Sequence, residues 1–188
     1  MKTLTAYILA GGKSSRMGSD KGLLLFNNRS IVSHIYDALL PIAGENVVVV
    51  SGNEKYDFLG VERIEDLVLD KGPVGGIFTA LSHTKTKLNL IVSVDVPLVS
   101  TELLQWILDN HSEDFLMTQV QTDEKSSPLI AVYDQKLLSA FKENLENDQL
   151  RLRKVIDSIT HQTLEVPKQW AFQLQNINTK EDYQRIQG

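Results

Sequence analysis

The sequence predicts an α/β fold: a single-domain, three-layer sandwich in which helices cover both faces of a mostly parallel sheet. Two features indicate this class. Short apolar runs such as Val47–Val50 are β-branched and lack alternation, which is typical of strands buried on both faces. These runs alternate with segments of helical spacing, a pattern that favours parallel βαβ units with right-handed crossovers. The length of 188 residues fits one domain, and neither a repeat nor a linker divides residues 1–188.

The first half of the chain shows the alternation clearly. Capping residues and apolar positions at helical spacing mark the helices, and unbroken apolar runs mark the strands. The expected elements are strand Thr5–Leu9, a helix capped by Ser30 with apolar residues Ile31, Ile35, Leu39 and Ile42 that ends near Pro41 and Gly44, strand Val47–Val50, helix Val74–His83 after Gly72-Pro73, strand Leu88–Val94, and a helix capped by Ser100 or Thr101.

The second half is less regular. Two strands are expected on either side of a polar stretch, and three helices follow, the last opened by a capping box of Thr179 and Asp182. The expected elements are strand Asp114–Val120, polar stretch Gln121–Ser127, strand Leu129–Tyr133, a helix over about Gln135 to Asn147, a short helix opened by the basic segment Arg151–Lys154, and a helix after Asn176–Asn178.

The composition excludes several classes of protein. The chain has no cysteine, which excludes disulfides, cysteine-based zinc sites, iron–sulfur clusters and thiol nucleophiles. With 19 Lys+Arg against 24 Asp+Glu, the net charge of −5 argues against nucleic acid or an anionic membrane as partner. No apolar run approaches the roughly 20 residues of a membrane helix, and the first one ends by Ala10, too early for a secretory leader. We expect a cytoplasmic protein.

The charge is unevenly distributed. Residues 1–94 carry 10 basic and 9 acidic side chains, whereas residues 95–188 carry 9 and 15. Lys13, Arg16 and Lys21 lie within nine residues, opposed only by Asp20. A small basic spot on an acidic protein suits a small polyanion, although a solvated loop with chance lysines has the same composition.

The basic spot lies in a glycine-rich loop that follows the first predicted strand. In open α/β sheets, ligands bind outside the carboxyl ends of the strands. Glycines 11, 12 and 18 let backbone N–H groups approach phosphate oxygens, and the three cations can neutralise a triphosphate or pyrophosphate. The loop is not a P-loop, because Tyr7 stands where the upstream glycine is required, and the dinucleotide fingerprint G-x-G-x-x-G is also missing.

Four motifs, in order along the chain, carry a resemblance to a known family. The sequence resembles the MobA-like molybdenum cofactor guanylyltransferases, which belong to the small nucleotidyltransferases with a Rossmann-like fold. The motifs are Leu9-Ala10-Gly11-Gly12 followed by Arg16-Met17-Gly18 and Asp20-Lys21, then Gly72-Pro73-Val74-Gly75-Gly76, then Asp95-Val96-Pro97, and finally Asn176-Ile177-Asn178-Thr179 with Glu181-Asp182.

The resemblance implies transfer of GMP from GTP to molybdopterin, with Mg²⁺ as the metal and pyrophosphate as the second product. Such a transfer needs no protein nucleophile, because positioning and charge neutralisation lower its barrier. Lys21 and Arg16 are the expected phosphate cations. Asp95, at the carboxyl end of a buried strand, is placed to hold Mg²⁺, although Asp-x-Pro also forms turns.

The resemblance also implies the residues that contact the nucleotide. They are the backbone of Leu9, Ala10, Gly11 and Gly12, the side chain of Lys21, either Ser51 or Asn53 after the second strand, Asp66 before the Gly72-Pro73 segment, and Asp95. A carboxylate at Asp66 can accept from guanine N1–H and N2–H together, and it can equally cap a loop.

The acceptor side is open to two interpretations. Arg151 and Arg153, with Lys154, can bind the acceptor's phosphate or form a solvated helix face. Asn176 and Asn178 can donate amides to the acceptor or only open the last helix. The family often has a larger polar residue before the proline equivalent to Pro128, where this chain has Ser126-Ser127.

Other functions remain open. The chain can be a nucleotidyltransferase with another substrate, either CTP with molybdopterin or a sugar or polyol phosphate, or a non-catalytic nucleotide-binding regulator. We expect a monomer with transient contacts to cofactor-synthesis or acceptor proteins, with the nucleotide bound by residues 1–100 and the acceptor by about 101–188.

Overall fold

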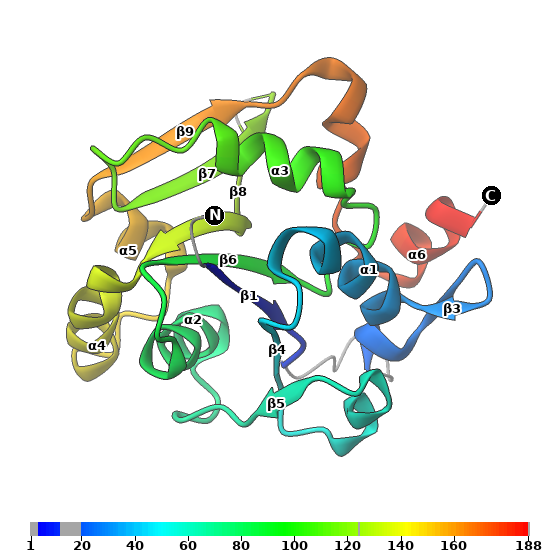
Figure 1. Cartoon of the computed structure of the whole chain (residues 1–188), viewed down its shortest axis with the longest axis horizontal. Helices are drawn as coiled ribbons and strands as arrows, with labels where there is room; N and C mark the ends of the chain where they lie inside the picture. The colour runs from blue at the N-terminus through cyan, green and yellow to red at the C-terminus, as the bar shows by residue number, and fades with distance from the viewer. Residues whose placement is uncertain (1–3, 12–19, 124, 188) are drawn as a thin grey trace.

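A computed structural model describes residues 4–11, 20–123 and 125–187. Seven strands form one sheet in the order β5-β4-β1-β6-β8-β7-β9 (Figure 1). Their bounds are β1 Leu4–Leu9, β4 Val47–Val50, β5 Glu62–Ile64, β6 Leu88–Ser93, β7 Met117–Thr122, β8 Lys125–Asp134 and β9 His161–Glu165. A separate hairpin pairs β2 Leu25–Phe26 with β3 Arg29–Ser30.

The strand order creates a switch point beside β1. From β1 the chain adds β4 and β5 on one side, and it then crosses back to add β6 on the other side of β1, all in parallel. Strand β8 runs antiparallel to β6 and β7, and β9 runs parallel to β7. Crevices at such switch points are the usual ligand sites of open α/β sheets, so the end of β1 is the place to look for one.

Helices cover both faces of the sheet, which confirms the predicted three-layer α/β class (Figure 1). Helices α1 Ile31–Ala43 and α3 Thr101–Asp109 pack on one face, and α2 Gly72–His83, α4 Leu138–Glu146 and α5 Leu152–Asp157 on the other. In β4, Val47 and Val49 enter the first core while Val48 and Val50 enter the second. Both faces of this strand are therefore buried, and its sequence has no reason to alternate.

The predicted elements of the first half are confirmed with small shifts. Gly44 ends α1 at a φ of 57°, a conformation that favours glycine. Helix α2 begins at Gly72, two residues before the predicted start, because Pro73 fits a first helical turn. Ser100 caps α3: its Oγ accepts a 3.3 Å hydrogen bond from the N–H of Leu103.

The second half departs from the expectations in its strands. The polar stretch at 121–127 was expected to separate two strands, but Lys125–Ser127 belongs to β8, which pairs with β7 down to Thr122. Four strands were not predicted, β2, β3 and β5 in the first half and β9 in the second, because they are short and partly exposed. The last helix, α6 Lys180–Gln187, has the predicted capping box: the N–H of Asp182 donates to Thr179 Oγ1 and the N–H of Thr179 to Asp182 Oδ2. No helix in the described residues is long and apolar enough to cross a membrane.

Phe141 packs α4 against the sheet, and its substitution tests the packing between this helix and β8. Its ring is fully buried and meets Tyr133 of β8 edge to face at 6.0 Å between centroids. Phe141→Ala leaves a cavity and is expected to lower the free energy of unfolding by about 3–5 kcal/mol. Phe58→Ala, at a ring that is 59% exposed, is the matched control and should change it by less than about 0.5 kcal/mol. Urea unfolding of both variants measures the difference, and equal effects would contradict the packing.

Candidate nucleotide site

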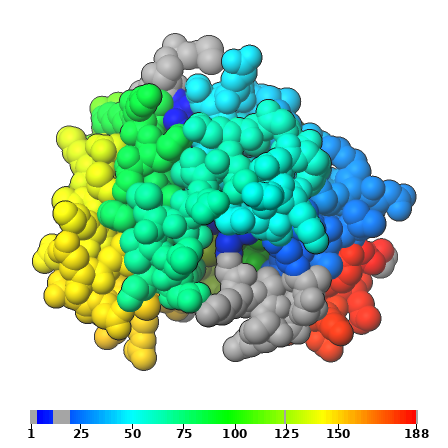
Figure 2. Space-filling view, turned by 90° about the horizontal axis from the view of Figure 1, so that it is seen from below, coloured from blue at the N-terminus to red at the C-terminus, as the bar shows by residue number. Residues whose placement is uncertain are grey.

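A pocket opens at the carboxyl ends of β1, β4 and β6, beside the switch point. Figure 2 looks onto this end of the molecule, where the dark blue end of β1 lies in a hollow beside the teal and green segments that follow β5. Strand ends supply one wall and the loop before α2, with its first turn, supplies the other. The lining residues are Leu9, Gly11, Val50, Asp66, Val68, Asp70, Lys71, Gly72, Pro73, Gly76, Ser93, Asp95 and Leu129.

Lys21 and Asp95 meet at the rim of this pocket. Lys21 begins the short 3₁₀ helix η1, Lys21–Leu23, and its Nζ lies 2.7 Å from Asp95 Oδ1. The two side chains are 14% and 32% exposed. The Asp95 N–H donates to Ser93 Oγ at 3.2 Å, which turns the chain directly after β6. The structure therefore brings together a cation and a carboxylate that are 74 residues apart in the sequence.

The segment before α6 completes this corner. Lys21 Nζ also donates to Asn178 Oδ1 at 3.2 Å, and the N–H of Ile177 donates to the Asp95 carbonyl at 2.8 Å. Asn178, predicted from the fourth motif, thus reaches the same point as Lys21 and Asp95. Asn176 is exposed.

Asp66 is a carboxylate without a described partner. It lines the pocket across from β1, where a Cβ added at Gly11 would come within 3.0 Å of its Oδ2. Within the described ranges no side chain or backbone group donates to its carboxylate. Burial raises the pKa of the Asp66 carboxyl. A partly buried carboxylate of this kind can accept hydrogen bonds from a ligand with N–H donors.

Ser51 and Asn53, between which the sequence did not decide, are both engaged inside the protein. The buried Ser51 hydroxyl donates to the Ala10 carbonyl at 3.1 Å and so fixes the end of β1. The Asn53 amide donates to Asp20 Oδ2 at 2.8 Å, and its Oδ1 accepts from the N–H of Lys55. Both residues shape the segment around the pocket.

The remaining predicted residues lie farther out or outside the described part. Arg151 and Arg153 are exposed at the start of α5. The loop before them reaches the pocket wall, because Lys71 pairs with Asp148 at 2.7 Å. Gly12 and Arg16 fall outside the described residues.

Three residues near the site had no predicted role, although Asp20 belongs to the Asp20-Lys21 motif. Asp20 caps η1, Tyr56 packs beneath it, and Lys71 lines the pocket. Lys71 can be found from its place directly before Gly72-Pro73. Tyr56 gives no local signal, since its partner lies 36 residues away.

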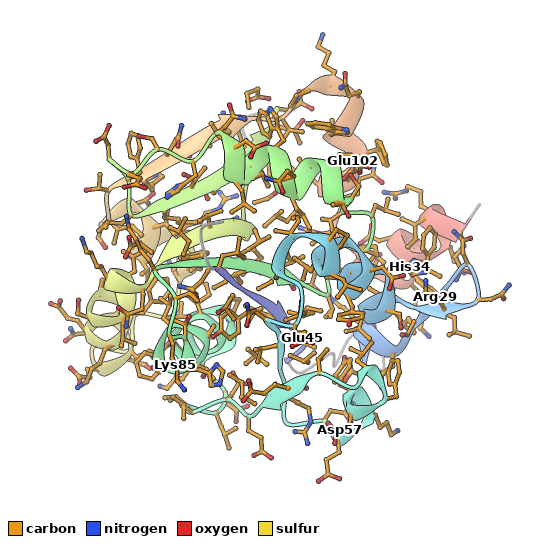
Figure 3. The ribbon with its side chains drawn as sticks, in the orientation of Figure 1. Arg29, His34, Glu45, Asp57, Lys85 and Glu102 are labelled. Atoms are coloured by element: carbon orange, nitrogen blue, oxygen red, sulfur yellow. The ribbon has the colours of Figure 1, made fainter. Side chains whose placement is uncertain are left out.

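None of the four histidines lines the pocket. His34 lies on α1, where its ring nitrogen bonds the Phe26 carbonyl of the hairpin at 2.7 Å (Figure 3). His83 ends α2, next to Tyr7. Among the described residues, no three His, Cys, Asp or Glu side chains gather as a metal site. A lone carboxylate such as Asp95 fits Mg²⁺, which commonly takes one or two carboxylates and completes its shell with substrate phosphates and water.

Comparison with known sequences decides the family. Residues 6–164 match the MobA-like NTP transferase domain. The chain belongs to the MobA-like NTP transferase family. This membership confirms the resemblance drawn from the four motifs. A relative from Flavobacterium johnsoniae, named "probable molybdenum cofactor guanylyltransferase", is 46% identical over 97% of this chain and 95% of its own length. A relative of the same name from Aquifex aeolicus is 31% identical over 98% and 90%.

Solved structures share the fold. A protein from Aquifex aeolicus with 29% identity superposes with a TM-score of 0.81, covering 94% of both chains. The molybdopterin-guanine dinucleotide biosynthesis protein A from Archaeoglobus fulgidus superposes with a TM-score of 0.83 over 97% of this chain and 96% of its own, at 20% identity. The predicted Rossmann-like sheet of a nucleotidyltransferase is confirmed.

The raised pKa of Asp66 predicts that its ionised carboxylate in this MobA-like site lowers the stability of the folded protein in a pH-dependent way. Between its unfolded and folded pKa values the folded protein holds more protons than the unfolded chain, so the stability contributed by Asp66 falls as pH rises through that window. Asp66→Asn removes this cost. We expect the variant to be more stable than the wild type at pH 7, with the difference vanishing below about pH 4, where the wild-type carboxyl is protonated in both states.

Urea unfolding across this pH range measures the difference. Glu45→Gln, at an exposed carboxylate just after α1 (Figure 3), is the control and should leave the pH dependence unchanged. An Asp66→Asn variant that is less stable than the wild type at pH 7 would show that the carboxylate supports the fold instead of serving a ligand.

Proposed function

We propose that this MobA-like protein transfers GMP from GTP to molybdopterin, forming the guanine dinucleotide form of the molybdenum cofactor and releasing pyrophosphate. The observation that carries the proposal is one pocket at the switch point that holds Asp95, paired with Lys21 at its rim, and Asp66, which has no donor among the described residues. The names of the relatives support the same reaction. It requires a site that takes a triphosphate at one end and a guanine at the other.

The phosphate end is built from the η1 turn and the end of β6. A phosphate oxygen of the acceptor attacks the α-phosphorus of GTP, the bond to the β-phosphate oxygen breaks, and pyrophosphate leaves with the electron pair. Lys21, together with Arg16, neutralises the charge on the phosphates as the bonds exchange. The glycine loop after β1 offers backbone N–H groups to the phosphate oxygens.

Asp95 is the residue placed to hold Mg²⁺. A divalent ion there supplies charge neutralisation across the phosphates. In the folded chain Asp95 is oriented from two sides, by its own N–H on Ser93 and by Lys21 on its Oδ1. A structural relative of 16% identity, from Mycobacterium tuberculosis, has been solved as a manganese complex, which supports a divalent ion in proteins of this fold.

The base end is built around Asp66. Its carboxylate can accept from guanine N1–H and N2–H at once, whereas adenine and cytosine do not offer that pair of donors. The half-buried position strengthens such hydrogen bonds, because less water competes for the carboxylate. The backbone of Leu9–Gly11 lies opposite and can contact the ribose or base.

The acceptor enters from the C-terminal half. Asn178 already touches Lys21, and Arg151 follows the Asp148 that pairs with the pocket residue Lys71. We assign residues 1–100 to the nucleotide and about 101–188 to molybdopterin, within one domain that acts as a monomer and meets cofactor-synthesis or acceptor proteins transiently. Asn176 and Arg153 belong to the same assignment.

Nucleotide preference is the first test. GTP with Mg²⁺ at 100 times its Kd should raise the free energy of unfolding by about 2.7 kcal/mol, and ATP and CTP should give clearly smaller shifts. Thermal unfolding with each nucleotide measures this, and pyrophosphate release with GTP should require molybdopterin. A shift with CTP but not GTP would replace GTP by CTP, and nucleotide binding without pyrophosphate release would indicate a non-catalytic regulator.

The ion pair provides the second test. Lys21→Ala and Asp95→Ala are each expected to lower kcat by about 10²–10³-fold, the cost of losing one group that stabilises developing charge. Lys87→Ala and Asp37→Ala are matched controls, because each removes a charge from an exposed ion pair away from the pocket. Pyrophosphate release gives kcat, and near-normal turnover in either variant would remove its assigned role.

A further inference from the structure

The turn that carries Lys21 is held by its neighbour Asp20. The Asp20 carboxylate accepts three hydrogen bonds: from the N–H of Gly22 at 3.2 Å, from the Asn53 amide at 2.8 Å and from the hydroxyl of Tyr56. All three partners are donors, and a carboxylate can accept from all of them at once. Asp20 is thus bound both to its own turn and to the segment that follows β4.

Tyr56 is the buried member of this cluster. It lies in the 3₁₀ helix η2, Glu54–Leu59, is 1% exposed, and packs in the core of the α1 face. Its ring occupies the space where a side chain at residue 22 would be: a Cβ on Gly22 would lie about 3.0 Å from ring carbons and still closer to the hydroxyl. The η1 turn therefore rests directly on the Tyr56 ring, and Gly22 makes that close approach possible.

The Tyr56 hydroxyl is a dependable donor. Burial raises its pKa well above the ordinary value, and the hydrogen bond to Asp20 adds to the shift. It stays protonated at physiological pH. Asp20 holds the turn from which the Lys21 side chain extends to Asp95. Asp95 follows β6 and Tyr56 follows β4, so the two residues lie on opposite sides of β1.

We propose that Tyr56 is a positioning residue that acts through Asp20 to fix Lys21 for phosphate binding. The proposal rests on the proposed role of Lys21 as a phosphate ligand. The ring and the hydroxyl of Tyr56 then have different roles: the ring packs in the core, and the hydroxyl orients the η1 turn that carries Lys21. A purely structural Tyr56 would contribute through its ring and the satisfaction of a buried polar group, with no specific link to Lys21.

A double-mutant cycle on phosphate binding tests the link. Tyr56→Phe keeps the ring and removes only the hydroxyl. Binding of inorganic triphosphate and of GTP, both with Mg²⁺, is measured by calorimetry in the wild type, Tyr56→Phe, Lys21→Ala and the double variant. We expect Tyr56→Phe to raise both Kd values about 10-fold, in line with the loss of a hydrogen bond to a charged group. In the Lys21→Ala background the same change should alter Kd by less than about 2-fold.

Tyr7→Phe is the matched control. Tyr7 is equally buried, and its hydroxyl bonds His83 Nδ1 at 3.0 Å near the other end of the sheet. It should leave both Kd values unchanged. Asp20→Asn is the second variant. It keeps a residue able to cap η1 but cannot accept from both Asn53 and Tyr56 as well as a carboxylate does, and it should show the same non-additivity with Lys21→Ala.

The outcomes separate the two proposals. Equal 10-fold losses with and without Lys21 would make Tyr56 structural only and overturn its positioning role. If the cycle for triphosphate binding is non-additive but the protein shows no preference for GTP over ATP and CTP, the positioning role is supported and guanylyl transfer is refuted. If neither probe binds the wild type, both proposals fall. A Tyr56→Phe variant that does not fold leaves the decision to Asp20→Asn, whose additive effect would also overturn the role.

Discussion

The ion pair between Lys21 and Asp95 is the contact on which the site depends. It joins the turn after β1 to the end of β6, and Asn178 adds the segment before α6 to the same corner. Without a nucleotide, the two charges neutralise one another. Because both side chains are partly buried, leaving either charge unpaired would destabilise the folded protein. In the proposed reaction the ammonium would exchange this partner for phosphate oxygens and the carboxylate would exchange it for a divalent ion. Because a pair this accessible contributes about 1 kcal/mol or less, exchanging it for those partners costs little.

The topology of the sheet makes this contact possible. The carboxyl ends of β1, β4 and β6 lie side by side because the chain returns across β1 after β5. Ser93 ends β6 and Asp95 follows it by two residues, so these two polar residues of the pocket are held by a strand buried along its whole length. The loops can then carry chemistry, while the double-sided core below them, described by Val47–Val50, supplies rigidity.

Local signals in the sequence predicted strands β1, β4 and β6 and helices α1 and α2 of the first half, but not its short strands β2, β3 and β5. Gly11 and Asp95 follow strands whose patterns are clear, so their place at one edge of the sheet followed from the α/β class. Lys21 was predicted from the glycine-rich loop motif and Asp66 from the family resemblance. The polar strand β9 and the first residues of β8 could not be found in this way, because their partners, and not their own hydropathy, make them strands. Tyr56 could not be predicted for the same reason, because its partner Asp20 lies 36 residues away and the two meet only where the chain returns after β4.

Asp66 shows how the same site balances folding against binding. Most partly buried carboxylates in this chain have donors: Asp20 has three, and Asp95 has Lys21. Asp66 has none within the described residues, and its pKa is raised by burial. A fold selected for stability alone would cap this group or replace it by an amide. A ligand that supplies the missing donors would account for the uncapped carboxylate, and in the proposed reaction these donors are N1–H and N2–H of guanine.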